Sequence, residues 1–472
     1  MSVLWLLLGL VVFGNKWGQF TPDIKPEIYL SPGRAAGDLM STWVVDQQLG
    51  LPNFNVGLAP VAGFVAALQG LGLDAWLSVR VLRLLLLVIA ATGATALSRH
   101  VTGSHGTFMG RTVAGVLFVV NPYVVVAGDT LAITLPLAFL PWQVLFLLRS
   151  IEQPGWRWPA AFALTFVPMS GMNAGVVPLL QLIYLPAVVW YVVARGTALR
   201  SVVTPLVRCG LLAIVLSLYW LIPAVAARGV GYNVVNNSET YRGIAGPSSF
   251  SEVLRGLGLW VMYGRDGSGP WQPGFTAYLT GPLVIVSSFV LPFLFAASCL
   301  AVRGPVRRLA SLMVLLAAVV MVGLHPPDGS APVGVAMRAL FDHVPGAAAF
   351  RTTNKAGAVL VLGMALMVGA AAPSIGRRQG GRRLAAGVAI VTALLVGSVW
   401  PAFSGGLYSD HLAIPSYWKA AATAVDKGDS SQRVWLIPGE VSSHYRWSRP
   451  RVDDIDKSLL SRPSVVHYTI PN

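Results

Sequence analysis

The sequence predicts an all-α polytopic membrane protein, a bundle of about eleven spanning helices with outer loops and a short α/β tail. Three observations support this prediction: the composition, the recurring apolar segments and the placement of the arginines. Hydrophobic residues make up 55% of the 472 positions, and Asp, Glu, Lys and Arg together only 11%. An ordinary soluble domain carries about 25% charged residues. Lipid is therefore the main solvent of this chain.

The formal net charge of +15 does not indicate nucleic-acid binding. The basic residues form short clusters between apolar stretches, which is where a membrane protein collects arginine in its cytoplasmic loops. The two cysteines, Cys209 and Cys299, both lie inside apolar runs, so we expect neither a disulfide framework nor a thiolate metal site.

Segments long and apolar enough to cross a bilayer recur along the chain. The first is short, but it lacks a basic leading region and a small-residue cleavage site, so we interpret it as an uncleaved anchor. The run 56–71 contains Pro60 and Gln69, and we expect it to lie in the outer membrane interface. The predicted spans are 1–14, 74–97, 112–128, 131–148, 158–170, 174–194, 209–227, 276–302, 309–324, 356–373 and 385–402.

The arginines orient this bundle. Alternate loops carry nearly all the Arg clusters, for example Arg195, Arg200 and Arg208, and only one acid, Glu152. The positive-inside rule places these loops in the cytoplasm. The opposite loops, 15–73, 228–275 and 325–355, and the tail 403–472 are then outside, and they hold nearly all the acidic residues. The chain is thus predicted to be a multi-pass plasma-membrane protein whose tail and chemistry face outward.

The first outer loop holds the strongest candidate for a catalytic base. Asp23 follows the first span closely, and Pro26 stiffens the backbone after it. A carboxylate there could accept the proton of an attacking sugar hydroxyl, or it could be a solvated loop acid or a turn former. Lys25, Glu27 and Asp38 of the same loop are further candidates for binding substrate.

The other outer loops offer three candidates. Glu252 follows Ser248 and Ser249 in the first turn of a predicted helix, where capping and the helix dipole also account for an acid. Arg351 and Lys355 lie at the outer mouth of a span, where the positive-inside rule gives no reason for basic residues. A lipid phosphate is one partner for them, and headgroup snorkelling is the alternative.

Several chemistries have no support in the sequence. The seven histidines show no metal-ligand spacing, and no glycine-rich phosphate loop follows a strand. A zinc hydrolase and an ATP-driven machine are therefore not indicated, no metal site is predicted, and a divalent cation requirement is left open.

Longer segments resemble a known family. TPDIKPEIYLSPGRAAGDLMSTWVVDQQLG after the first helix, NVGLAPVAGFVAALQGLGLDAWLSVRVLRLLLL, GRTVAGVLFVVNPYVV and FRTTNKAG resemble the membrane domain of actinobacterial alpha-(1,3)-arabinofuranosyltransferases of the AftD type. The resemblance runs along essentially the whole chain. It implies a GT-C glycosyltransferase fold with the active site at the outer face of the bundle.

The resemblance also implies the substrates and some roles. The donor would be decaprenylphosphoryl-arabinofuranose, and the acceptor an arabinan of the cell envelope, in arabinogalactan or lipoarabinomannan. The family's acid in the first outer loop matches Asp23, and its other implicated acid and base positions match Glu252 and Arg351. In an inverting transfer, Asp23 would take the acceptor's proton while Arg351, helped by Lys355, stabilises the departing lipid phosphate.

Residues 1–402 are expected to form the transmembrane catalytic domain. Residues 403–472 would begin an outer soluble domain, which about seventy residues can scarcely complete. Family members are much longer, so a fragment, a truncated product, or a split protein completed by a partner chain all stay open.

Three other functions also stay open. One is a lipid or sugar transporter or flippase without chemistry; ionisable residues within spans mark such pathways, and here the span interiors hold few, chiefly Arg80 and Arg83 in the second. Another is a different GT-C enzyme such as a mannosyltransferase. The third is a scaffold or carbohydrate-binding anchor.

Overall fold

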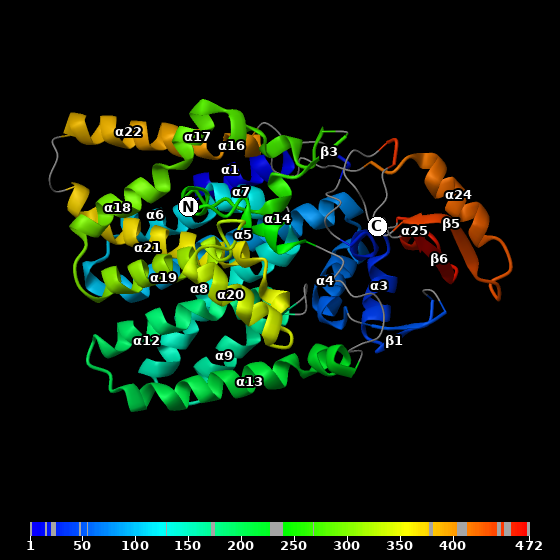
Figure 1. The fold of residues 1–472 in the computed structure, drawn as a ribbon, viewed down its shortest axis with the longest axis horizontal. Coiled ribbons are helices and arrows are strands. Elements are labelled where there is room, and N and C mark those ends of the chain that lie inside the picture. The colour runs from blue at the N-terminus through cyan, green and yellow to red at the C-terminus, as the bar shows by residue number, and fades with distance from the viewer. Residues whose placement is uncertain are drawn as a thin grey trace.

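The computed structural model describes residues 2–14, 17–19, 25–46, 49–53, 55–128, 130–170, 175–226, 239–267, 269–376, 381–403, 413–440, 445–447 and 455–469. The long helices lie side by side in one bundle, and the C-terminal tail lies beyond one end of it (Figure 1). Asp23, the predicted base, is outside the described residues.

Seven helices among the described residues are long and apolar enough to cross a membrane. Several of them combine shorter helical pieces in series. They are formed by α5 (Ala75–Thr102), α8 (Leu131–Glu152), α11 (Val176–Gln181) with η4 (Leu182–Tyr184) and α12 (Leu185–Val193), α13 (Leu199–Ala226), α17 (Pro282–Ser288) with α18 (Val290–Ala301), α19 (Pro305–Val322), and η8 (Thr353–Ala356) with α21 (Gly357–Gly376).

The remaining predicted spans coincide with shorter helices. These are α1 (Ser2–Phe13), α6 (Phe108–Val119), α7 (Pro122–Ala127), α9 (Arg157–Leu164), α10 (Phe166–Met169), α22 (Gly381–Ser398) and α23 (Trp400–Phe403). The prediction of an all-α polytopic membrane protein is confirmed. Length and hydropathy alone identify fewer spans than the eleven predicted segments, because some of those segments are short or interrupted.

One interruption has a clear local cause. Asn121 lies between α6 and α7, and its Nδ2 donates to the carbonyls of Leu117 and Phe118, both at 2.9 Å. Its Oδ1 accepts the N–H of Val124 at 3.1 Å, which caps α7, and Pro122 occupies the first position of that helix. The asparagine therefore satisfies both helix ends at a break inside the bundle.

The core of the bundle is built around α21, which packs against α5, α6, α18 and α19. Small residues permit close backbone approach, as is usual between membrane helices. A Cβ on Gly369 would lie 2.6 Å from the carbonyl oxygen of Gly110, and a Cβ on Gly110 would lie 2.4 Å from that of Gly369. Only glycine fits at this crossing of α6 and α21.

The other elements lie in the connecting loops and the tail. The first long loop contains α2 (Glu27–Leu30), α3 (Pro32–Leu39), β1 (Trp43–Val44), β2 (Leu51–Pro52), η1 (Val56–Leu58) and α4 (Ala59–Gly70), and η2 (Gly103–His105) follows α5. The second contains α14 (Tyr241–Ala245), α15 (Phe250–Leu254), η5 (Trp260–Met262), β3 (Arg265–Asp266), β4 (Gly269–Pro270), η6 (Pro273–Phe275) and α16 (Ala277–Thr280). The third contains α20 (Pro332–His343) and η7 (Ala347–Phe350).

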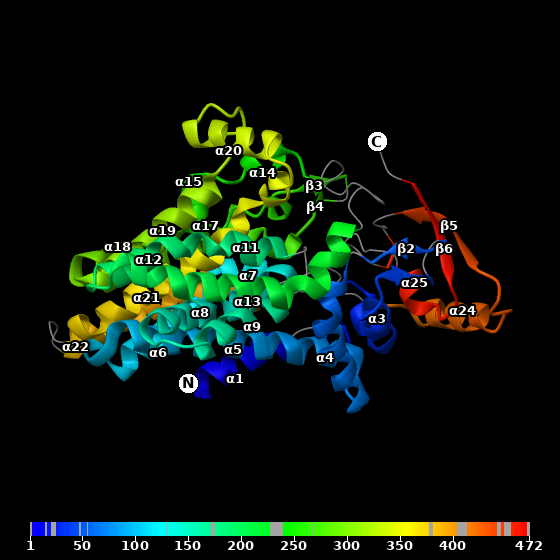
Figure 2. The same ribbon diagram turned by 90° about the horizontal axis from the view of Figure 1, so that it is seen from below.

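α4 corresponds to the run predicted to lie in the interface. It crosses the direction of the long bundle helices in both views (Figures 1 and 2). Gln69, the polar residue near the end of α4, is hydrogen-bonded: its Nε2 donates to the carbonyl of Tyr29 at 2.8 Å. A helix that runs across the spans is the geometry expected of an interfacial segment.

The tail contains α24 (Ser416–Asp426), β5 (Val434–Glu440), α25 (Asp456–Leu459) and β6 (Ser464–Thr469), and β5 pairs with β6 in parallel. It is held to the first long loop by hydrogen bonds. Arg34 donates to the carbonyls of Ser458 at 3.1 Å and of Leu460, and the N–H of Ser464 donates to the carbonyl of Asp46 at 2.9 Å. The expected start of an α/β unit is present and docked.

The arginine-bearing connections gather at the opposite end of the bundle. The links from α12 to α13 and from α18 to α19 lie together at the left in both views, away from the tail (Figures 1 and 2). This separation agrees with the alternation of loops inferred from the arginines.

Candidate functional site

The first long loop concentrates carboxylates. Glu27 opens α2, Asp38 lies near the end of α3, and Asp46 follows β1. Burial raises the pKa of Asp38, and the charges of Asp46 and Glu27 raise it further, whereas the charge of Arg34 lowers it. Oε2 of Glu27 is buried and has no hydrogen-bond partner within the described part of the chain. The tertiary structure thus brings two predicted substrate-binding acids, Glu27 and Asp38, into electrostatic contact. Lys25 lies two residues before α2 and is partly buried.

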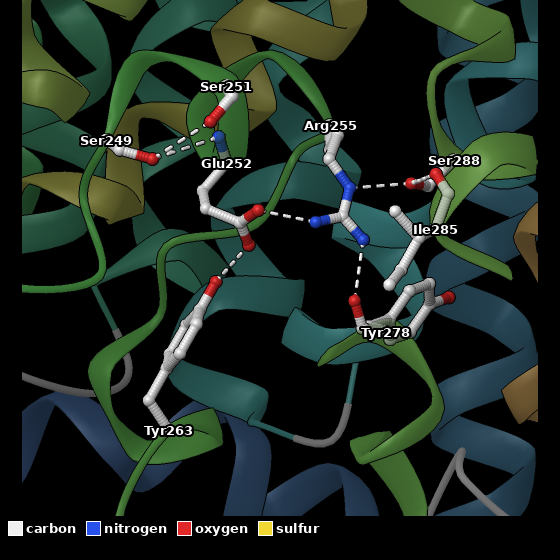
Figure 3. A network of polar contacts seen from close by, with 8 residues as sticks. All are labelled: Ser249, Ser251, Glu252, Arg255, Tyr263, Tyr278, Ile285 and Ser288. Carbon is white, nitrogen blue, oxygen red and sulfur yellow. Dashed lines mark hydrogen bonds and ion pairs between the residues drawn. The ribbon is translucent and has the colours of Figure 1, made fainter. Parts of the chain in front are cut away.

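Glu252 lies in a network of polar contacts in the second long loop (Figure 3). Its N–H donates to Ser249 Oγ at 3.4 Å, the expected cap, whereas Ser248 Oγ donates to the carbonyl of Ile244 at 2.8 Å. Its Oε1 pairs with Arg255 at 2.5 Å, and its Oε2 accepts from the hydroxyl of Tyr263. Both carboxylate oxygens are therefore engaged by protein groups.

Arg255 connects this network to the bundle. The side chain is 5% exposed, and its Nε donates to Ser288 Oγ of α17 at 2.6 Å. A terminal nitrogen donates to the carbonyl of Tyr278 in α16 at 2.7 Å. A buried guanidinium with all three nitrogens bonded anchors the loop to the start of a span. Arg255 was not identified from the sequence, although its position three residues after Glu252 is the spacing of a helical ion pair.

Arg351 is also paired. The side chain is buried, and one terminal nitrogen lies 3.0 Å from Oε2 of Glu239. The other terminal nitrogen donates to the carbonyl of Ala348 at 2.9 Å, and Nε donates to the carbonyl of Glu239 at 3.2 Å. Thr352 Oγ1 also lies 3.5 Å from Oε1 of Glu239. The acid was not identified from the sequence, because it is 112 residues away along the chain.

Tyr123 of α7 joins these loops. Its hydroxyl donates to the carbonyl of Lys355 at 3.4 Å. A Cβ built on Gly357 would lie only 2.1 Å from Cε2 of the Tyr123 ring, so the ring fills that space. A Cβ built on Gly256 would lie 3.0 Å from the Cβ of Tyr123. Gly256 directly follows Arg255 and has a φ of +77°, a conformation that favours glycine. The segments carrying Arg255 and Lys355 therefore meet at one tyrosine.

An apolar cavity of about 290 Å³ lies on another side of α7. Val124 and Val125 of α7 and the Gly128 that follows the helix line it together with mostly apolar side chains of α1, α5, α6, α8, α22 and α23. Arg83 is the only charged residue of the lining among the described residues, and it donates to the carbonyl of Gly128 at 3.2 Å. The volume is roughly twice that of an engineered apolar cavity that binds benzene, so part of a hydrocarbon chain fits.

Arg80 and Arg83, the charged residues inside the second predicted span, have structural contacts. Arg80 donates to the carbonyls of Val12 at 2.5 Å and Gln19 at 3.3 Å, which ties α5 to α1. Arg83 bonds the end of α7, as described above. These contacts give both buried arginines a structural role in the bundle. Among the described residues, no group of His, Cys, Asp and Glu side chains could hold a metal ion.

Comparison with known proteins gives the family. The family model for the N-terminal GT-C domain of alpha-(1->3)-arabinofuranosyltransferase matches residues 7–472. No curated protein sequence matches. Three cryo-EM structures of arabinofuranosyltransferase AftD from mycobacteria, two of them of a variant, match with TM-scores of 0.70, 0.71 and 0.61 and identities of 21%, 20% and 21%.

These structural matches cover 100% of this chain but only 32%, 33% and 33% of the longer ones, so the chain spans about a third of its solved relatives. At this identity the likeness establishes the fold, and the family model covers nearly the whole chain. The chain belongs to the family of N-terminal GT-C domains of alpha-(1->3)-arabinofuranosyltransferases.

Proposed function

We propose that this chain is a membrane arabinofuranosyltransferase that moves arabinofuranose from a polyprenyl-phosphate donor to an arabinan of the cell envelope. The observation that carries the proposal is the meeting of the outer-loop segments at Tyr123. There the segments that carry Arg255 and Lys355 and the apolar cavity share one short helix, α7. A lipid-linked sugar needs a polar environment for its phosphate and sugar and an apolar environment for its hydrocarbon chain.

The proposed reaction is an inverting transfer. The acceptor hydroxyl oxygen forms a bond to the anomeric carbon, the bond from that carbon to the phosphate oxygen breaks, and the polyprenyl phosphate leaves. Asp23 takes the proton of the hydroxyl as general base. The activated sugar is delivered by its lipid, so the step needs no nucleotide.

Cations balance the charge that grows on the departing phosphate. Lys355 lies in η8, two residues before the start of α21, whose N-terminus also favours an anion. Arg351 is engaged by Glu239, and its direct contact with the donor would need that carboxylate to exchange for a phosphate. We assign the direct contact to Lys355 because of its place at this N-terminus, and a positioning role to Arg351, which holds η7 and η8 to the second long loop.

Glu252 is likewise assigned a positioning role. Its two oxygens hold Arg255 and Tyr263, and Arg255 continues to Gly256 beside Tyr123. A general acid or base needs an oxygen within reach of the proton that it transfers. Glu27, with one buried oxygen that has no partner within the described part of the chain, is a better second carboxylate for binding sugar hydroxyls.

The orientation of the chain in the membrane is inferred from the two ends of the bundle. The two ends of the bundle differ, with the arginine-bearing loops at one end and the tail at the other. We infer that the chain lies in the plasma membrane with the tail, the carboxylates and the reaction outside. Since solved relatives are about three times as long, further domains in the same protein or in a partner chain would complete the binding of the acceptor.

The direct test is transfer by the purified chain in lipid nanodiscs. A synthetic polyprenyl-phosphoryl-arabinofuranose is supplied with an arabinan oligosaccharide, and products are identified by mass spectrometry and linkage analysis. We expect one added pentose with inverted configuration. A matched polyprenyl-phosphoryl-mannose tests the alternative enzyme, and transfer of mannose alone would overturn the assignment. A preparation that binds the arabinose donor but transfers no sugar would contradict the proposal that this chain is an active transferase.

A further inference from the structure

The third long loop contains a helix whose surface is not explained by the proposed reaction. α20 (Pro332–His343) lies between α19, which ends at Val322, and η8 with α21, which starts at Thr353. Both flanking helices are long and apolar enough to span the membrane. The loop is therefore tethered to one membrane surface at both ends, and α20 lies close to that surface.

One flank of α20 packs on the protein. Gly334 and Phe341 are buried, and Phe341 and Met337 join a hydrophobic cluster with Leu324 and Ala245. These α20 positions fall within one face, because successive residues of a helix are rotated by about 100°. This flank explains why the loop folds back onto the second long loop.

The adjoining flank is apolar but exposed. Val333, Leu340 and Val344 are exposed by 44%, 48% and 47%. At about 100° per residue Val333 and Leu340 fall within roughly 20° of each other, and Val344 follows the helix directly as its C-cap. We call these three residues the exposed stripe. Figure 2 shows α20 at the margin of the bundle, with no other described element above it.

The remaining side of α20 is polar. It carries Arg338, Asp342 and His343, and Asp342 accepts a hydrogen bond of 2.9 Å from the hydroxyl of Tyr241. Val335, 56% exposed, lies on this side, roughly 160° from Val333 around the helix axis. α20 thus has a protein flank, an apolar exposed flank and a polar flank.

We infer that α20 is a membrane-surface helix whose exposed stripe, Val333, Leu340 and Val344, inserts among the lipid chains of the adjacent leaflet. A helix with these flanks lies in the plane of the interface, its apolar side buried about 5–10 Å below the headgroups. The tether of α20 to two spans favours lipid over a protein partner, since lipid is already present at that surface.

This contact would set the depth of the candidate donor site. α20 is bonded through Asp342 to Tyr241, and Glu239, two residues earlier, pairs with Arg351. Membrane depth is thus transmitted through two contacts to the segment that carries Lys355. This consequence rests on the proposed function, whereas the membrane contact itself does not.

The test compares how strongly lipid quenches labels at two positions of the exposed stripe and at one position of the polar flank. Cys209 and Cys299 are replaced by serine, and Val333→Cys, Leu340→Cys and Val335→Cys are each labelled with an environment-sensitive fluorophore in nanodiscs. Lipids brominated on the acyl chain should quench the labels at 333 and 340 at least threefold more than the label at 335. Equal quenching at 333 and 335, or none at any position, would overturn the inference. The second result would assign the stripe to a protein partner or a second copy.

A second measurement avoids the cysteines. Nanodiscs of the native-sequence chain containing a phospholipid with a diazirine on its acyl chain are irradiated, and the digest is analysed by mass spectrometry. Lipid adducts are expected at Val333, Leu340 or Val344 and not at Val335. Adducts on the polar flank alone would contradict the proposal. Because this readout needs neither substitution nor activity, it stands even if transfer by this chain is disproved.

Discussion

At the scale of single residues, charged side chains identified from the sequence divide into two groups. Glu252 and Arg351 have their charged atoms engaged by protein partners, so they hold loops in place. Glu27 and Asp38 lie in a cluster of carboxylates on the first long loop, and burial, together with the neighbouring carboxylates, raises the pKa of Asp38. Residues of the second group are better suited to bind or activate a substrate, because no ion pair engages their carboxylates within the described part of the chain.

Asp23→Asn should slow transfer by roughly 100-fold or more while donor binding is largely retained, because the amide keeps the shape but cannot accept the proton. Single-turnover transfer and donor affinity measure the two effects separately. Asp46→Asn, an exposed acid of the same loop, is the matched control. Near-normal turnover of the Asp23 variant would eliminate the assignment, and loss of activity only in Asp38→Asn would move the role there.

Lys355→Ala should weaken donor binding by about tenfold, which corresponds to roughly 1.4 kcal/mol, because a charge-assisted contact to the phosphate is lost. Lys355→Arg should restore most of the affinity. Calorimetry with the donor in nanodiscs gives both values, and Lys419→Ala in exposed α24 serves as the control. Unchanged affinity of Lys355→Ala would require another cation at the phosphate.

Asp38→Asn should change how stability depends on pH. Burial raises the pKa of the Asp38 carboxyl above its ordinary value of 3.8, so the folded state holds the proton more tightly than the unfolded state. Ionisation therefore destabilises the fold as the pH rises from about 4 through the raised pKa. The melting temperature of the variant relative to the parent should be higher at pH 7 than at pH 4. A difference that is independent of pH, or that falls, would contradict the assignment.

At the scale of elements, the ion pair of Arg255 with Glu252 anchors the second long loop to the bundle. α15 (Phe250–Leu254) is short, and Arg255 at its end attaches it to α16 and α17. The loop therefore has a fixed geometry next to Tyr123, which a loop held only by surface contacts would not have. Breaking a buried pair is costly because one charge is left uncompensated.

Arg255→Ala should destabilise the chain by about 3 kcal/mol, near the lower end for a broken buried pair, because Glu252 keeps some contact with solvent. Arg265→Ala, at an exposed arginine of the same loop, should have little effect. Thermal or denaturant unfolding in detergent gives the comparison. The double variant with Glu252→Gln should recover part of the loss, and equal stability of the two single arginine variants would show that the pair is not an anchor.

At the scale of the whole molecule, the two ends of the bundle have different chemistry. Arginine-bearing links gather at one end, whereas the tail docks at the other through Arg34 and Asp46. The reaction, the interfacial helices α4 and α20, and the tail would then share one membrane surface. This arrangement suits a reaction in which one substrate lies in the bilayer and the other is a polymer outside it.

Reporter fusions test this orientation. An alkaline phosphatase fused after Phe403, at the end of α23, should be active because the tail is exported. The same enzyme fused after Gly376, at the end of α21, should be inactive because the following link is cytoplasmic. The reverse pattern would invert the whole topology and with it the proposed location of the reaction.

The sequence by itself determined the class of the protein and most of its helices. Apolar segments of bilayer length are a local property of the chain, and so are helix stops such as Asn121–Pro122 and caps such as Ser249. The strand at 434–440 and the helix at 416–426 were also predictable from local pattern. Long segments of similarity gave the family, since they extend over many positions at once.

Only the tertiary structure decided which residues meet. Arg351 and Glu239 lie 112 residues apart, and Tyr123 and Lys355 lie 232 apart; no local pattern encodes such pairs. The same holds for the exposed stripe of α20, whose sequence shows an apolar face but not which part of that face packs on Leu324. Contacts of this kind depend on how the helices pack, because packing selects one partner among many residues of suitable chemistry.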